Sequence, residues 1–191
     1  MQHVKTVFLA FLFSALSGLA MADDHGSAMP KPIPVEFWLC EYNEGKNASD
    51  LQPVIKEWKK TMGKRNYQSW MLTPTYASNG ALNNSVMFTG WWDNFSIMGK
   101  EVDYTMANVD PKMNPKWSEV ITCDTHAEAF AIQTRNEMDT SLENGVMSYR
   151  QCAYKEGKGS TDLMKAIAEW NKFLTKAGVG KSSSAVIFPG V

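Results

Sequence analysis

The sequence predicts an α+β fold, in which helices pack on one face of an antiparallel sheet, and three observations predict it. A segment of strand character followed by an amphipathic helix occurs twice, at residues 35–60 and 147–172. Further strand-like runs and a second helical stretch lie between the two copies. Hydrophobic residues make up 44% of the chain, which is typical of a soluble globular protein. Strand and helix periodicities within one repeated unit favour the α+β class.

The first 22 residues have the pattern of a secretory signal peptide. A basic start at Lys5 precedes an apolar run from Val7 to Leu19, and the small residues of Ala20-Met21-Ala22 suit cleavage after Ala22. The apolar run is short and interrupted by small residues, which disfavours a membrane span. We therefore expect a periplasmic or secreted product without a membrane anchor, which begins with a flexible leader over residues 23–33.

Charge and composition exclude several function classes. The 19 basic and 20 acidic residues nearly balance, so electrostatic binding of nucleic acid is disfavoured. The mature chain has two histidines, His25 and His126, and no C-x-x-C pattern, so we expect no metal site and no thioredoxin-like redox site. The sequence identifies no cofactor.

The internal repeat is the most specific signal in the chain. A shift of 112 positions aligns Val35–Lys60 with Met147–Lys172 without a gap, and 11 positions are identical. Chance does not plausibly align cysteine, tyrosine and tryptophan together, so we infer that one supersecondary unit was duplicated. The identical pairs are Cys40/Cys152, Tyr42/Tyr154, Glu44/Glu156, Gly45/Gly157, Lys46/Lys158, Asp50/Asp162, Leu51/Leu163, Ile55/Ile167, Glu57/Glu169, Trp58/Trp170 and Lys60/Lys172.

Each copy begins with a predicted strand, Val35–Tyr42 in the first and Met147–Tyr154 in the second. A Glu-Gly-Lys turn follows in both copies. A helix then begins at a Ser or Thr cap, Ser49 or Thr161, and glycines are expected to end the two helices. The helices share an apolar stripe at spacings of three and four residues. The stripe consists of Leu51, Val54, Ile55, Trp58 and Met62 in the first copy and Leu163, Ala166, Ile167, Trp170 and Leu174 in the second.

The region between the two helices supplies the other predicted elements. Asn and Gly residues between two strand-like runs are typical of a hairpin, and the Pro/Asn-rich stretch after the next helix predicts a loop. The resulting order, β-α-β-β-α-β, is that of the ferredoxin-like or split βαβ unit. The elements are strands at 67–76 and 85–92, a helix at 95–108, a loop at 108–115 and a last strand between 119 and 133.

With this order the chain resembles the dimeric α+β barrel superfamily, in which two ferredoxin-like units pack the bare faces of their sheets together. The resemblance concerns the fold only, because no catalytic motif of a member family occurs in the sequence. It implies a first unit over residues 34–140 and a partial second unit over 141–191. The predicted class is therefore α+β, with tandem ferredoxin-like units of dimeric α+β barrel type and an incomplete second unit. An unpaired strand edge favours a truncated reading frame over completion by another chain.

Alternation along the first strand of each copy divides its side chains between the two faces of the sheet. We expect the aliphatic face of the first copy to pack against the helices. The other face would then line the space between the sheets, where the superfamily holds its ligands, although packing in a structural core explains it as well. The helix-facing set is Val35, Phe37 and Leu39, and the other set is Trp38, Cys40 and Tyr42 with Arg150, Cys152 and Tyr154.

The three cysteines allow one disulfide in an oxidising compartment. Two sheets packed about 10 Å apart would place Cys40 and Cys152 beyond disulfide reach. Because the fourth strand neighbours the first in a ferredoxin-like unit, Cys123 is the favoured partner of Cys40. Buried free thiols remain the alternative.

The aromatic residues of the region 67–105 predict a ligand cavity or a packed interface. Trp91 and Trp92 are adjacent on a strand, so they point to opposite faces and one of them leaves the helix-facing core. The candidate ligand-binding residues are Trp38, Tyr42, Trp91, Trp92 and Tyr154. His126 is the candidate general base or haem ligand, and an ordinary surface histidine is the alternative.

Three functional hypotheses follow. The first is an exported protein that binds a small apolar or aromatic molecule in an aromatic-lined space between two sheets. The second is a cofactor-poor oxygenase or haem-linked enzyme, in which His126 and Tyr42 or Tyr154 transfer protons. The third is a structural or interaction module without a ligand, and a homo-oligomer is compatible with all three.

Overall fold

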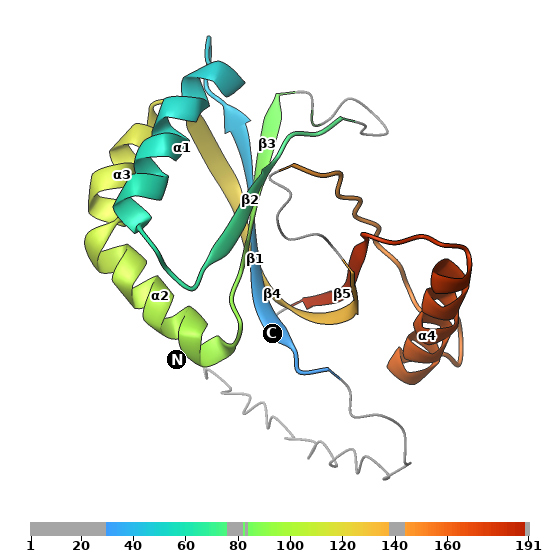
Figure 1. Ribbon diagram of the computed structural model, residues 1–191. Coiled ribbons are helices and arrows are strands. Elements are labelled where there is room, and N and C mark those ends of the chain that lie inside the picture. Colours follow the sequence, from blue (N-terminus) through green and yellow to red (C-terminus); the bar gives the residue numbers. More distant parts are fainter. Residues whose placement is uncertain (1–29, 76–81, 83, 138–143, 190–191) are drawn as a thin grey trace, which may run out of the picture.

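The structure is a computed structural model that describes residues 30–75, 82, 84–137 and 144–189. It confirms the α+β class, with one five-stranded antiparallel sheet and four helices in the described part. Three helices, α1, α2 and α3, lie together on one face of the sheet, and α4 lies on the other side (Figure 1). The elements are β1 (Ile33–Tyr42), α1 (Ala48–Met62), β2 (Gln68–Leu72), β3 (Ser85–Trp91), α2 (Phe95–Asn108), α3 (Asp110–Ser118), β4 (Ile121–Asn136), α4 (Ser160–Lys176) and β5 (Ser183–Pro189).

The predicted signal peptide, residues 1–22, and most of the leader lie outside the described residues. None of the described helices is long and apolar enough to cross a membrane. Most of the predicted hairpin connection, residues 77–84, also lies outside the described part.

The sheet has the strand order β2-β3-β1-β4-β5, and every neighbouring pair is antiparallel. β1 therefore lies in the centre, where Glu36 pairs with Gly90 of β3 and Glu128 of β4. The register of β1 against β4 shifts between Leu39 and Cys40. β4 is long and bends around to carry β5 at the far edge of the sheet (Figure 1).

Helix α1 is confirmed, but its N-cap differs from the prediction. The cap is Asn47 rather than Ser49, because the Asn47 side chain accepts a hydrogen bond from the Ser49 backbone N–H at 2.8 Å. The Asp50 carboxylate in turn accepts from the Asn47 backbone N–H at 3.0 Å, which completes a capping box. In α4 the cap is likewise Gly159 rather than Thr161, and Asp162 accepts from the Gly159 N–H at 3.2 Å.

The stretch that was predicted as a loop, residues 108–115, is mostly helical. Helix α3 begins at Asp110, directly after the end of α2, and Pro111 occupies its first turn. Proline is tolerated there because the first N–H groups of a helix have no partner within it. The prediction treated proline as a loop signal and overlooked this position.

The second copy of the repeat differs from the first at its predicted strand. Residues 147–154 form no strand, whereas the equivalent residues 35–42 lie in β1. The helix and the following strand of the second copy are present as α4 and β5. A strand requires a neighbour for its backbone hydrogen bonds, and β1 has two, β3 and β4.

The faces of the sheet are the reverse of the prediction. Cys40, flanked by Trp38 and Tyr42, packs in a core cluster with Leu51 of α1. By alternation Val35, Phe37 and Leu39 point away from these helices. Both faces of β1 carry apolar residues, so alternation divides the side chains into two sets but does not say which set meets the helices. The handedness of the β1-α1-β2 crossover decides which face the helices cover.

Candidate functional site

The structure separates the predicted ligand-binding residues. Trp38 and Tyr42 pack on the helix side of the sheet. Trp92 is buried, 4% exposed, against the ring of Tyr67. Trp91 points to the opposite face, as the alternation of two adjacent tryptophans predicts. Tyr154 lies on the surface at 51% exposure, so the five residues do not form one cavity in this chain.

The face that carries Trp91 is an apolar surface across three strands, which we call the open face. Trp91 meets Trp70 of β2 edge to face, with ring centroids 6.4 Å apart. The register of β1, β2 and β3 places these side chains on one side, and all are half-buried. The open face consists of the half-buried Phe37, Leu39, Trp70, Leu72, Met87 and Trp91, and the same register places the fully buried Val35 and Thr89 among them.

Part of the open face is covered by the second copy of the repeat. Tyr149 meets Phe37 edge to face, with ring centroids 5.7 Å apart. The two residues are equivalent, because a shift of 112 positions aligns them. Burial raises the pKa of the Tyr149 phenol, so this side chain stays neutral. The contact therefore brings equivalent positions of the two copies together.

A polar cluster lies on the helix side of the sheet around Glu36. The Glu36 carboxylate accepts hydrogen bonds from the Tyr67 hydroxyl at 2.6 Å and from the Trp38 indole N–H at 3.1 Å. His126 Nε2 lies 2.9 Å from the same carboxylate. The imidazole also stacks on the Trp38 ring, with centroids 3.7 Å apart. These contacts fix the orientation of the imidazole, whose side chain is 33% exposed.

Tyr67 reaches Glu36 because the neighbouring strand leaves space for it. A Cβ atom on Gly90 would lie 2.3 Å from the Tyr67 hydroxyl oxygen. Desolvation by burial, followed by the charge of Glu36, raises the pKa of Tyr67. Tyr67 thus remains a hydrogen-bond donor to Glu36 at every physiological pH. Burial and the charge of Glu36 also raise the pKa of Asp110.

The predicted proton-transfer partners of His126 lie elsewhere. Tyr42 is four residues beyond Trp38 on β1, which corresponds to about 13 Å along a strand. Its hydroxyl is buried and has no hydrogen-bond partner among the described residues, and burial raises its pKa. Tyr154 lies on the exposed connection before α4. The groups that contact His126 are Glu36 and Trp38 instead.

Cys40 and Cys123 form a disulfide across β1 and β4, and Cys152 is a free, exposed thiol. The bond closes a sequence separation of 83 residues. Cys40 lies in the core cluster under α1, whereas Cys123 is exposed, and the bond links the central strand to β4.

Comparison with protein-family models, curated proteins and solved structures finds no match to this chain. The functional argument therefore rests on the geometry of the sites themselves.

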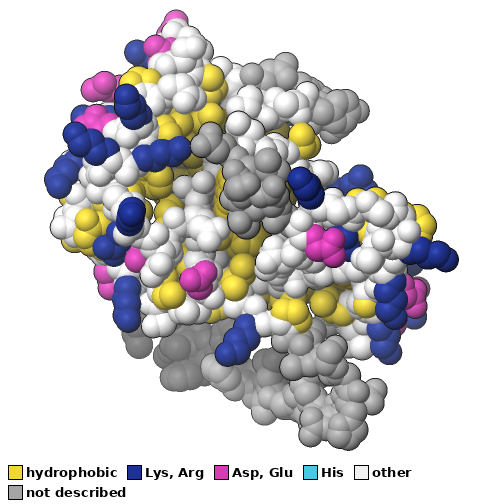
Figure 2. All heavy atoms as spheres, viewed as in Figure 1, with side chains coloured by type: hydrophobic (Ala, Val, Ile, Leu, Met, Phe, Trp, Pro, Cys, Tyr) yellow, Lys and Arg dark blue, Asp and Glu magenta, His cyan; other side chains and the backbone are white. Residues whose placement is uncertain are grey.

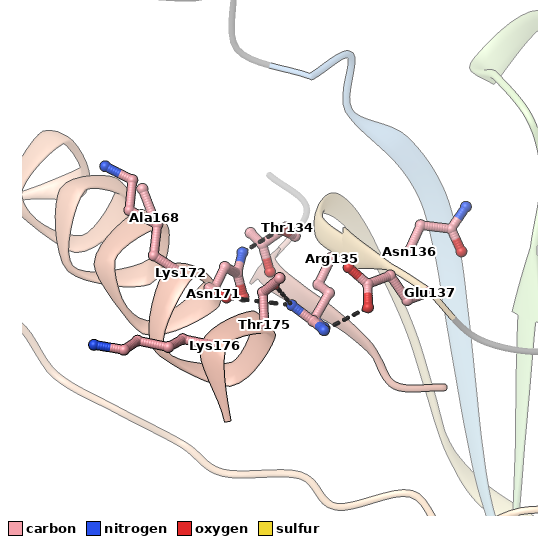
Figure 3. Close-up of a pocket in the computed structure, with 9 residues that line it drawn as sticks. All are labelled: Thr134, Arg135, Asn136, Glu137, Ala168, Asn171, Lys172, Thr175 and Lys176. Atoms are coloured by element: carbon pink, nitrogen blue, oxygen red, sulfur yellow. Dashed lines mark hydrogen bonds and ion pairs between the residues drawn. The ribbon is translucent and has the colours of Figure 1, made fainter. Parts of the chain in front are cut away.

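A cavity of about 600 Å³ lies between β4 and α4 (Figure 3). Arg135 points into the junction of these elements and is 7% exposed. Its guanidinium donates to Thr175 Oγ1 at 3.2 Å, to the Val179 carbonyl at 2.7 Å and to Glu137. The charge of Arg135 is thus already compensated, and its contacts attach α4 to the sheet.

A second cavity of about 220 Å³ is bordered by Trp58, Arg65 and Tyr67. Arg65 forms an ion pair with Glu101 at 2.6 Å and lies over the ring of Tyr104. Groups of three or more His, Cys, Asp and Glu side chains suited to a metal ion do not occur in the described residues.

Sequence reasoning missed Glu36 and Tyr67. Glu36 alternates with Trp38 and Cys40, so the pattern placed a carboxylate on the same face as two core residues. A carboxylate on a core face requires hydrogen-bond donors around it, and this requirement was the sequence signal that could have identified Glu36. Tyr67 gave no comparable signal, because its contact with Glu36 joins residues 31 positions apart.

Proposed function

We propose that this chain is an exported protein that binds a flat, apolar small molecule on the open face. The observation that carries the proposal is a surface of aromatic and aliphatic side chains, which includes Trp70 and Trp91 and which none of the described helices covers. Flat apolar ligands bind such surfaces because ring contacts add to the burial of apolar area. The disulfide fits an oxidising compartment.

The topology of the sheet supports the proposal that the open face binds a ligand. The order β2-β3-β1-β4, with helices on one side, fits a split βαβ unit. We infer that this unit is one wall of a dimeric α+β barrel arrangement and that the second copy of the repeat forms the opposing layer. The contact between the equivalent residues Phe37 and Tyr149 supports this inference. The ligand would occupy the space between the two layers, beside Tyr149.

The test is a fluorescence titration with N-phenyl-1-naphthylamine, a flat and neutral probe. We expect saturable binding by the wild-type chain. Trp91→Ala should weaken it about tenfold, which corresponds to about 1.4 kcal/mol. Phe95→Ala is the matched control, because Phe95 is an exposed aromatic residue of α2 on the helix side, and it should leave binding unchanged. Equal affinities of the wild type and Trp91→Ala would refute the proposal.

The second candidate is an enzyme that uses His126 for proton transfer, and the Glu36 contact favours it. A carboxylate oxygen 2.9 Å from one ring nitrogen orients the imidazole. The other ring nitrogen, Nδ1, would then exchange protons with a substrate. In this proposal Glu36 replaces Tyr42 and Tyr154 as the partner of His126.

Hydrolysis of p-nitrophenyl acetate tests the enzyme candidate with a simple activated ester. We expect His126→Ala to abolish hydrolysis above the buffer rate and Glu36→Gln to lower it at least tenfold. His25→Ala is the control for hydrolysis by an ordinary histidine. Equal rates for His126→Ala and His25→Ala would contradict a role for His126.

A further inference from the structure

The middle of the open face holds a polar side chain, Thr89. In the register of the sheet, Thr89 of β3 lies opposite Phe37 of β1 and Trp70 of β2, so its hydroxyl stands between two aromatic residues. Thr89 is fully buried, and its Oγ1 has no hydrogen-bond partner among the described residues. A buried hydroxyl without a partner is unfavourable, so a ligand that hydrogen-bonds to it would remove this penalty.

A second polar atom of the open face also lacks a partner. Trp91 is two residues beyond Thr89 on β3, so both side chains point to the same face, about 7 Å apart along the strand. The indole Nε1 of Trp91 is buried and makes no hydrogen bond within the described part of the chain. An indole N–H donates only, whereas a threonine hydroxyl both donates and accepts. The open face therefore offers hydrogen-bonding groups within an apolar surface.

The surroundings of these two groups favour a neutral ligand. Hydrophobic side chains show at the surface between helices α1–α3 and the lobe that carries α4, along the strands of the sheet (Figure 2). A charged ligand would find no counterion among the neighbours of the two groups on the adjacent strands, and burial of an uncompensated charge is unfavourable. Those neighbours are Val35, Phe37, Gln68 and Trp70.

The side chain that lies beside Thr89 in the structure is Tyr149. Its ring meets Phe37 edge to face, with ring centroids 5.7 Å apart, and Phe37 pairs with Thr89 across the sheet. Burial raises the pKa of the Tyr149 phenol, and the nearby Thr89 hydroxyl lowers this pKa by a smaller amount. The two hydroxyls nevertheless do not reach hydrogen-bond geometry. A neutral phenol of the chain itself thus occupies the middle of the open face without pairing with Thr89.

Few contacts hold Tyr149 in this position. Residues 144–159 belong to no helix or strand. Backbone hydrogen bonds between described residues do not attach the segment 147–154 to the sheet. Tyr149 is 44% exposed, as is Met147. The Tyr149 ring can therefore leave Phe37 without the loss of a hydrogen-bonded ladder, as in segments of low local stability.

We propose that the open face binds a neutral aromatic molecule with a hydroxyl group, a phenol, which takes the position of the Tyr149 side chain. This inference rests on the proposed function, because it names the class of molecule that the open face binds. The ligand ring packs on Phe37 as the Tyr149 ring does, and the ligand hydroxyl makes the hydrogen bond to Thr89 that Tyr149 does not make. Thr89 then determines specificity, and Tyr149 competes with the ligand until it is displaced.

Equilibrium dialysis with 2-naphthol and naphthalene, which differ by one hydroxyl group, tests the contact with Thr89. Thr89→Val keeps the shape of the side chain but deletes its hydroxyl. It should weaken the binding of 2-naphthol about fivefold and leave that of naphthalene within about twofold. Thr61→Val is the matched control, because it deletes a hydroxyl of α1 on the helix side, and it should change neither affinity. Circular dichroism checks that both variants are folded.

The outcomes separate this inference from the proposed function. If naphthalene binds the wild type but Thr89→Val retains the full affinity for 2-naphthol, the phenol proposal is overturned and the proposed function stands. If neither compound binds the wild type, both are overturned.

Replacement of Tyr149 tests the competition. Tyr149→Ala removes the side chain that occupies the site, so 2-naphthol should bind about threefold more tightly than to the wild type. Tyr154→Ala is the matched control, because Tyr154 lies on the same segment and is 51% exposed, and it should leave the affinity unchanged. Unchanged or weaker binding of 2-naphthol by Tyr149→Ala would overturn the displacement of Tyr149 by the ligand.

Discussion

At the scale of single residues, Glu36 defines the polar chemistry of the helix side. A carboxylate at a central strand position loses water on folding, and this loss is unfavourable unless hydrogen bonds replace it. Tyr67 and Trp38 donate to Glu36, and His126 lies at hydrogen-bond distance. The side chain of Glu36 is 13% exposed, so these contacts replace most of its hydration.

Removal of the Tyr67 hydroxyl should destabilise the fold. Tyr67→Phe leaves the ring in place but deletes a 2.6 Å hydrogen bond to a charged group. We expect a loss of about 2 kcal/mol in the free energy of unfolding, measured by urea denaturation. Tyr154→Phe is the control, since Tyr154 is exposed, and it should change this free energy by less than about 0.5 kcal/mol. Equal stability of the two variants would contradict the role of Glu36 as an acceptor.

Gly90 should be intolerant of alanine for the same reason. The added methyl group would overlap the Tyr67 ring and displace it from Glu36. We expect Gly90→Ala to lower the free energy of unfolding by about 1–3 kcal/mol. Gly99→Ala in α2 meets open space and should instead stabilise the protein by about 0.5–1 kcal/mol, since alanine favours helices. Thermal unfolding of both variants tests this prediction. A Gly90→Ala variant as stable as wild type would refute the close approach of Gly90 and Tyr67.

At the scale of elements, the start of α4 depends on pH. The Gly159 N–H, and then Lys158, stabilise the charged form of Asp162 and lower its pKa. A lowered pKa in the folded state adds stability above the unfolded value of about 3.9, and this stability disappears as the pH falls through the folded pKa. Asp162→Asn should therefore lower the urea midpoint at pH 7, and the difference from wild type should shrink below about pH 4. A difference that grows in acid would contradict this assignment.

The elements also show what sequence reasoning can reach. Hydrophobic periodicity predicted α1, α2, α4, β1 and β3, because the apolar residues of each element lie on a face that the spacing reveals. The N-cap residue of α1 was harder to predict. Asn47 and Ser49 can both cap a helix, and only the backbone geometry decides between them. The side of the sheet that β1 presents to α1 was not predictable from alternation. For the same reason Trp38, Cys40 and Tyr42 were predicted to lie on the face away from the helices, whereas Phe37 and Leu39 lie there.

At the scale of the whole molecule, the disulfide holds the sheet together. It joins the central strand to β4 across 83 residues, so it removes much of the freedom of the unfolded chain. Cys40→Ala with Cys123→Ala should lower the free energy of unfolding by about 4–5 kcal/mol, measured by urea denaturation. Cys152→Ser should leave this value unchanged, because Cys152 is an exposed free thiol. A double variant as stable as wild type would show that the bond does not restrict the unfolded chain.

The duplicated sequence adopts two different environments in the molecule. In the first copy β3, β4 and the helices on the same side surround the repeated segment, so the cysteine, the tyrosine and the helix stripe enter a core. In the second copy the same residue types lie largely at the surface. The sequence revealed the repeat but not this difference, because burial depends on partners far along the chain or on another molecule.

The central claim is that the open face binds a flat, apolar molecule, and native mass spectrometry of the protein tests it most directly. We predict a bound mass on the wild-type protein that is lost on denaturation and that is reduced or absent on Trp91→Ala, with Phe95→Ala like wild type. A ligand-free mass for the folded wild type, together with no uptake of N-phenyl-1-naphthylamine, would contradict the claim.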